Sequence, residues 1–196
     1  MKIKLFILCF SLLSLNSFGQ RKKTVNKPKI ATVLAKLDNV SVEILKNNLY
    51  VFNTKVGKDS KTDTIILKMN IQKSMPIDCK ISVVNLKPNQ FYIISWVENE
   101  ITTTKLKTEE ATTVFTEICD FSNKTKVFSN FQKTTKIKEI RFLDVNQTVS
   151  ETIDKIRKEG NEFKIQPDGI VIQTNKKGEI KWIYNPKEKI YVLKQK

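Results

Sequence analysis

Segments in which apolar and polar residues alternate follow one another through most of this chain of 196 residues. Residues 179–184, for example, read Glu, Ile, Lys, Trp, Ile, Tyr. Side chains of a β-strand point to opposite faces in turn, so a period of two is typical of strands. The segments expected as strands are residues 40–44, 49–52, 64–69, 77–86, 91–97, 101–106, 112–121, 126–131, 136–145, 169–174, 179–184 and 189–193. About a dozen short strands joined by tight turns, such as Asn47-Asn48, predict a mainly β fold: an antiparallel β-sandwich or barrel.

Residues 148–159 depart from this pattern and predict one short helix. Thr148 with Glu151 three residues later forms a capping-box pattern, and Gly160 is a typical residue at which a helix ends. Val149, Ile153 and Ile156 fall on one face of such a helix. We expect a single β-rich domain over residues 39–196. The alternative is a subdivision near residues 147–160, followed by a small C-terminal sheet.

The segment Phe91–Val97 is apolar on both faces of the expected strand. It is either a central strand covered on both sides or the wall of a cavity. The cavity alternative leads to a barrel that holds a small apolar ligand, as a lipocalin does.

Four aromatic residues are tentative binding residues, because Tyr92 and Trp96 share one strand face and Trp182 and Tyr184 share another. Aromatic side chains line ligand pockets and anchor protein interfaces. The alternative is that all four belong to the core.

The first 19 residues predict a cleavable secretory signal. Lys2 and Lys4 supply the positive charge, the stretch 5–15 supplies the apolar core, and Ser17 and Gly19 precede the cut. A membrane-spanning helix needs about 20 apolar residues, more than this stretch contains. The sequence therefore predicts a protein exported to the periplasm or secreted, with no transmembrane segment after cleavage. Residues 20–38 are expected to be a basic linker.

Positive charge dominates the chain, with 35 Lys and Arg against 20 Asp and Glu and a net charge of +15. Only Arg21, Arg141 and Arg157 are arginines, and the lysines are scattered along the expected strands. Proteins that bind nucleic acid rely on arginine for bidentate contacts to bases. Nucleic acid is therefore not the expected partner, and the charge leaves two alternatives open, an acidic protein and an anionic surface of the cell envelope.

After signal cleavage the chain keeps two cysteines, Cys79 and Cys119, each on the apolar side of an expected strand. In an oxidising compartment two cysteines are enough for one disulfide. The alternative is two buried free thiols that act as small apolar side chains.

Several kinds of catalytic chemistry lack their residues in this sequence. The chain contains no histidine, which excludes the usual Ser-His-Asp and Cys-His mechanisms and histidine-ligated metals. Its few glycines are not grouped, so neither a P-loop nor a dinucleotide fingerprint is present. The acid pairs Glu98/Glu100 and Glu109/Glu110 are expected on solvated surface. We identify no catalytic residue, no metal ligand and no cofactor; a hydrolase that uses two carboxylates is the remaining enzymatic alternative.

These observations favour an exported, non-catalytic binding protein of the cell envelope that recognises another protein, for example as an inhibitor or immunity-type protein. The alternative is a lipocalin-like carrier of a small apolar ligand.

Overall fold

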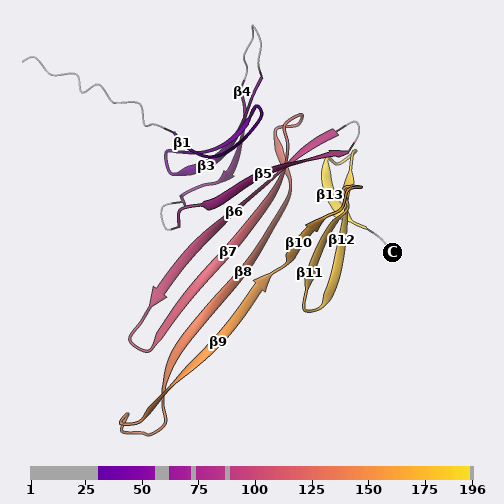
Figure 1. Cartoon of the computed structure of the whole chain (residues 1–196). Coiled ribbons are helices and arrows are strands. Elements are labelled where there is room, and N and C mark those ends of the chain that lie inside the picture. The colour runs from indigo at the N-terminus through magenta and orange to yellow at the C-terminus, as the bar shows by residue number, and fades with distance from the viewer. Residues whose placement is uncertain (1–30, 56–61, 72–73, 87–88, 195–196) are drawn as a thin grey trace, which may run out of the picture.

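The computed structural model describes residues 31–55, 62–71, 74–86 and 89–194. These residues form antiparallel strands in three sheets, each a meander in which consecutive strands are neighbours (Figure 1). Sheet A contains β1 (Thr32–Leu37), β2 (Val40–Leu45), β3 (Asn48–Thr54) and β4 (Thr62–Lys68). Sheet B contains β5 (Ile77–Leu86), β6 (Asn89–Thr103), β7 (Lys107–Asp120), β8 (Thr125–Phe142) and β9 (Ser150–Gly160). Sheet C contains β10 (Glu162–Ile165), β11 (Val171–Asn175), β12 (Gly178–Asn185) and β13 (Ile190–Leu193).

Sheet B lies between the other two sheets, and its strand β6 directs apolar side chains to both of them. Ile94 and Trp96 point to one face and pack in a core with side chains of sheet A. Phe91 and Ile93 point to the opposite face and pack in a second core with side chains of sheet C. We call these the A face and the C face of sheet B. Of the two alternatives for Phe91–Val97, the central strand covered on both sides is confirmed.

The mainly β, sandwich-type prediction is confirmed, and the barrel alternative is wrong because the three sheets do not close into a barrel. The strands are not all short. β8 has 18 residues and joins two segments that were expected as separate strands. No helix in the described residues is long and apolar enough to cross a membrane.

The helix predicted for residues 148–159 is wrong, because residues 150–160 form β9 and pair with β8 from Phe142 to Gln132. Asp144 accepts hydrogen bonds from the Thr148 hydroxyl at 2.6 Å and from the Val149 amide at 2.9 Å, so the expected helix cap is part of the β8–β9 loop. Pairing with a long neighbour satisfies the backbone groups of the segment, which a capping pattern in the sequence does not reveal.

The predictions for the N-terminal residues are only partly covered by the structure. The signal and the first part of the linker lie outside the described residues. Residues 32–37, expected as linker, form β1 and pair with β2, so that part of the linker prediction is wrong. At the other end, residues 162–193 form a separate C-terminal sheet, which packs onto sheet B through the second core.

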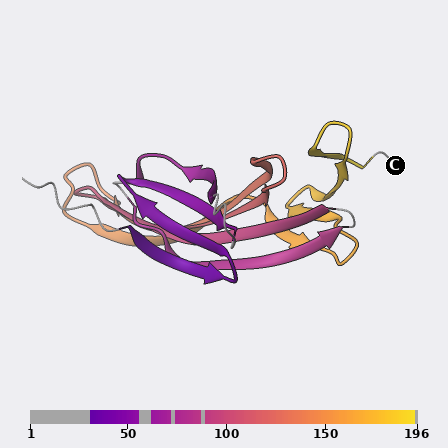
Figure 2. The ribbon, with the colours of Figure 1, turned by 90° about the horizontal axis from the view of Figure 1, so that it is seen from above.

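The strands β6–β9 run well beyond sheets A and C (Figures 1 and 2). We call this extension the open half of sheet B, and it comprises residues 99–103, 107–114, 131–142 and 150–160. Apolar side chains there remain exposed, among them Ile101, Phe131 and Ile156. The open half is therefore the part of the fold that most lacks a covering layer.

Candidate binding surface

The register of sheet B sorts the side chains of the open half between its two faces. Because Phe115 packs against the sheet A core and pairs with Phe131, odd-numbered residues of β8 from Ser129 onward point to the A face. Lys136 and Lys138 therefore point to the C face. Strand pairing places Ile156 of β9 and Glu110 of β7 in the same row as Lys136.

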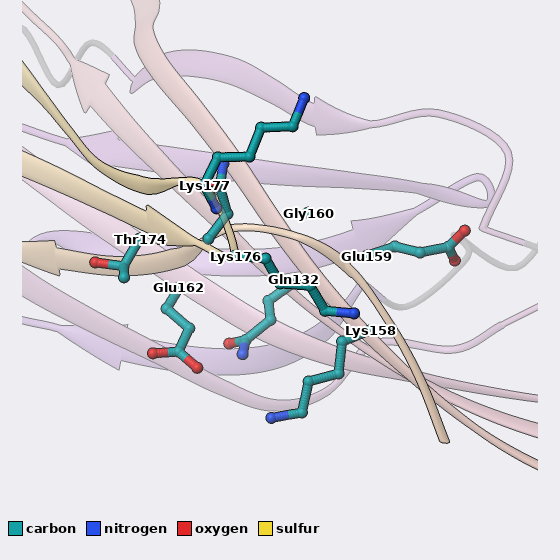
Figure 3. A pocket seen from close by; sticks show the side chains of 9 residues that line it. Gln132, Lys158, Glu159, Gly160, Glu162, Thr174, Lys176 and Lys177 are labelled. Carbon is teal, nitrogen blue, oxygen red and sulfur yellow. Dashed lines mark hydrogen bonds between the residues drawn. The ribbon is translucent and has the colours of Figure 1, made fainter. Parts of the chain in front are cut away.

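A cleft of about 520 Å³ lies where the C face meets sheet C (Figure 3). We call it the upper cleft. It is lined by Gln132, Lys158, Glu159, Gly160, Glu162, Thr174, Asn175, Lys176 and Lys177. Figure 3 shows Lys158, Gln132 and Glu162 on one side of the cleft, with Glu159 directed away from them. Its walls come from the end of β9, the start of β10 and the turn between β11 and β12.

Hydrogen bonds of Asn161 hold the walls of the upper cleft together. The Asn161 amide donates to the Phe131 carbonyl at 3.0 Å, and its own carbonyl accepts from Asn130 Nδ2 at 3.0 Å. Its side-chain oxygen accepts from Asn175 Nδ2 at 2.8 Å, which ties β11 to the β9–β10 junction. Asn130 in turn accepts from buried Gln173 of sheet C at 2.7 Å. The cleft is therefore fixed to the packed part of the fold.

A second cleft of about 440 Å³ lies further along the open half, and we call it the lower cleft. Its lining residues are Thr108, Glu110, Lys136, Ile137, Lys138, Asp154, Lys155 and Ile156. Most of them point to the C face. Six lysines line the two clefts, and all except Lys155, which pairs with Glu139 on the A face, lie on the side of the C face. We call Lys136, Lys138, Lys158, Lys176 and Lys177 the basic strip.

The A face of the open half carries a different arrangement of charge. Lys107 and Arg157 approach Glu109 at 2.5 and 3.8 Å, and Lys155 approaches Glu139 at 2.9 Å. Hydrogen bonding to these lysines lowers the pKa of both glutamates. On the C face, by contrast, the lysines of the basic strip form no ion pair with any described residue. Five lysines without an ion-pair partner among the described residues thus lie on the C face, compared with two such cations, Lys133 and Arg141, on the A face of the open half.

The four aromatic residues proposed as binding residues pack into the two cores. Trp96 is 1% exposed, stacks on Phe115 with ring centroids 5.2 Å apart, and belongs to the sheet A core together with Tyr92. Trp182 and Tyr184 pack against the other core. Tyr92 also lines a small cleft of about 130 Å³, and Tyr184 one of about 530 Å³. The structure does not bring the four together at one site.

Of the two alternatives for the cysteines, the structure has the free thiols, with Cys119 buried and Cys79 half-buried, and not the disulfide. They belong to β5 and β7, and β6 lies between these strands. Two strand spacings amount to about 10 Å, whereas a disulfide needs Cα atoms within about 7 Å. Burial raises the pKa of the Cys79 thiol to about 11 and of the Cys119 thiol to about 12.

One acid expected on solvated surface is buried instead. The Glu98 carboxylate accepts from Lys68 Nζ, from Trp96 Nε1 at 2.9 Å and from Ser74 Oγ at 3.0 Å. It therefore joins β4 of sheet A to β6 of sheet B. Glu109 and Glu110 are neighbours in a strand and point to opposite faces, so they do not form a carboxylate pair. Among the described residues, no group of three or more acids or cysteines is placed to hold a metal ion.

The basic strip was not predicted from the sequence. Lys136 and Lys138 carry the signal, since two lysines at a spacing of two share a face of a strand. The basic strip can be recognised only when the uncovered face of β8 and the position of Lys158 are both known. The helix predicted for residues 148–159 placed Lys158 incorrectly. Known proteins add no information here, because no family model, curated protein or solved structure matches this chain.

Proposed function

We propose that this chain is an exported, non-catalytic binding protein of the cell envelope that recognises another protein through the open half of sheet B. Export rests on the signal pattern in residues 1–19. The observation that carries the proposal is the extension of β6–β9 past both flanking sheets (Figure 1). A sheet normally buries its apolar face against another layer, and here a partner would supply that layer.

Exposed apolar side chains on the open half support a protein partner. Ile101 is 70% exposed and Ile156 is 69% exposed on the C face, and Phe131 is 47% exposed on the A face. Apolar contacts surrounded by charged and polar groups are typical of protein–protein interfaces. Binding would remove these side chains from water.

The described carboxylates support a non-catalytic role. A hydrolase that uses two carboxylates needs one acid with a raised pKa beside a second one in a cleft. Among the described acids, Glu117 is the one whose pKa is raised. It is 7% exposed in sheet B, where Ser129 and Lys126 contact it. The glutamates of the open half whose pKa is shifted, Glu109 and Glu139, are shifted downward.

The lipocalin-like alternative was motivated by the strand Phe91–Val97, which is apolar on both faces, and the structure explains this strand without a cavity. Such a carrier needs a barrel with an interior cavity. The strand Phe91–Val97 is instead covered on both faces, with Phe91 and Ile94 both 0% exposed. We therefore do not propose a small apolar ligand.

A capture experiment tests the proposal. Mature protein beginning at Gln20 is immobilised and incubated with envelope extract at low and at moderate salt. We compare wild type with Ile156→Lys on the C face and Phe131→Lys on the A face. Ile190→Lys in sheet C is the matched control, because Ile190 is also exposed, at 45%.

We expect a defined protein that wild type and the control retain and that at least one of the two open-half variants loses. Retention of no protein at either salt concentration would overturn the proposal. Equal retention by all four proteins would show that the open half is not the binding surface.

A further inference from the structure

We infer that the partner presents an extended acidic segment, and that this segment lies along the C face of the open half against the basic strip. This inference rests on the proposed function and specifies the chemistry of the partner. It commits to one occupant, an extended polypeptide stretch that directs acidic side chains and an apolar one toward the strip.

The first support is the way the strands place the lysines. Lys136 and Lys138 are two residues apart on β8, so both project from the same face. Lys158 projects from β9 on that face, and Lys176 and Lys177 come from the β11–β12 turn beside the upper cleft. From Gln132 in the upper cleft to Lys138 in the lower cleft, β8 extends about 20 Å. An extended segment of six or seven residues (about 3.3 Å per residue) covers that length.

The second support is the contrast in charge between the two faces. On the A face of the open half, ion pairs such as Lys155–Glu139 at 2.9 Å engage Lys107, Lys155 and Arg157, and leave Lys133 and Arg141 without a described acidic partner. The basic strip on the C face makes no such pair with a described residue. Complementary charge steers association and selects among partners, so carboxylates of a partner fit the C face better than the A face.

The third support is what lies between the lysines. Glu110 pairs across the strands with Lys136, and Asp154 pairs with Lys138. These acids would repel a uniformly charged phosphate backbone. Both Arg141 and Arg157 lie on the opposite face, where they cannot contact a ligand on the basic strip. Ile156 is exposed in the middle of the strip, which suits an apolar side chain of a polypeptide.

A charge-reversal experiment with a defined probe tests the inference. The probe is a fluorescent, Glu-rich peptide with a central Val, about ten residues long so that it spans the strip. The strip variant is Lys136→Glu/Lys138→Glu. The matched control is Lys133→Glu/Arg141→Glu, which makes the same change of charge on the same strand but on the A face. Parallel samples contain a single-stranded oligonucleotide and vesicles of phosphatidylglycerol and phosphatidylethanolamine.

We expect wild type to bind the peptide with an affinity that falls as salt rises, because exposed charge pairs are screened. The strip variant should bind it about tenfold more weakly, since two exposed pairs each contribute up to about 1 kcal/mol. The A-face control should change the affinity far less.

Three outcomes would overturn the inference. The peptide does not bind at low salt; both double variants weaken its binding equally; or the oligonucleotide or the vesicles bind more tightly than the peptide and lose binding in the strip variant. Each of these leaves the proposed function standing if the capture experiment yields a partner. Conversely, if wild type captures no partner protein, the proposed function is wrong, whether or not the peptide binds.

Discussion

Lys68 Nζ lies 2.5 Å from Glu98 Oε2, and this ion pair connects β4 of sheet A to β6 of sheet B. The Glu98 side chain is 7% exposed, and the same carboxylate accepts the Trp96 indole N–H. The Lys68 ammonium also lies 4.5 Å from the centre of the Phe115 ring. The Glu98 carboxylate thus links sheets A and B beside the apolar core that they share.

We expect Glu98→Ala to destabilise the protein by about 3 kcal/mol, because it leaves the Lys68 ammonium and the Trp96 N–H without their buried acceptor. Urea denaturation followed by tryptophan fluorescence measures the change. Glu100→Ala is the control, since Glu100 lies two residues further along the same strand and is exposed. Equal effects of the two substitutions would contradict the assigned role of Glu98.

Gly160 is the residue at which the chain leaves sheet B for sheet C. Its φ is +78°, and a Cβ there would lie 2.2 Å from the Phe131 carbonyl oxygen. A non-glycine residue in the left-handed conformation lowers the free energy of unfolding by roughly 1–2 kcal/mol. We expect Gly160→Ala to lower it further, because the backbone at Phe131 must also move to make room for the Cβ. Gly178→Ala is the comparison, since Gly178 also has positive φ but has nothing within 4 Å of such a Cβ. If thermal denaturation gives both variants the same loss, the close approach to Phe131 is not a constraint.

Glu117 makes stability depend on pH in a defined direction. Burial raises its pKa above the ordinary value, and the hydrogen bond from Ser129 and the nearby Lys126 only partly oppose this effect. The folded protein therefore binds this proton more tightly than the unfolded chain. The resulting stabilisation is complete below the ordinary glutamate pKa and is lost as pH rises through the raised folded pKa.

Glu117→Gln removes this dependence. Wild type should therefore lose stability relative to the variant as pH rises from about 4 to neutral, because only wild type must then bury a charge. Urea midpoints of the two proteins over that range measure the difference. A difference that stays constant with pH, or that changes in the opposite direction, would contradict the raised pKa.

The thiols of Cys79 and Cys119 should both be free in mature protein isolated without reductant. We expect alkylation to be slow in the folded state, since burial raises both pKa values far above neutral and the thiolate is the reactive form. After denaturation without reductant, mass spectrometry should find both cysteines alkylated. Recovery of a Cys79–Cys119 linked peptide would contradict the arrangement of β5, β6 and β7.

Hydrogen exchange distinguishes β9 from the helix that its sequence suggests. Only alternate amides of an edge strand point toward its neighbour, so protection along residues 150–160 should alternate with a period of two. Between Gln132 and Glu139, β8 pairs with β7 on one side and with β9 on the other. The amides of this stretch should therefore be protected without interruption. Continuous protection of residues 152–159 would indicate a helix instead.

Much of the fold could be predicted because strand patterns are local. Residues 77–86 were expected as a strand and form β5 with the same bounds. The turn expected at Asn47-Asn48 lies one residue earlier, at Lys46-Asn47, where both residues have positive φ of 49° and 63°. Asn tolerates positive φ well, so the pair Asn47-Asn48 was expected to form the turn. The pairing of Leu45 with Asn48 sets the register of the hairpin and places the turn at the two residues between them.

The candidate surface could not be predicted in the same way, because whether a face of a sheet is core or exposed surface depends on which other elements cover it. Tyr92 and Trp96 suggested a binding face, yet sheet A covers that face and makes them core. The lysines of the basic strip come from β8, β9 and a turn in sheet C, and no local pattern states that these segments meet.

The sequence by itself determined that the chain is rich in antiparallel β-structure, since alternation with a period of two and the turn residues depend only on neighbours along the chain. It also determined the chemistry that is missing, above all histidine. Tertiary structure alone decided that residues 150–160 are a strand, because their pairing with β8 over the whole segment depends on where that neighbour lies and not on the local sequence pattern. It also decided which lysines are paired on the A face and which stand together on the C face, since that depends on strand register and on where sheets A and C end.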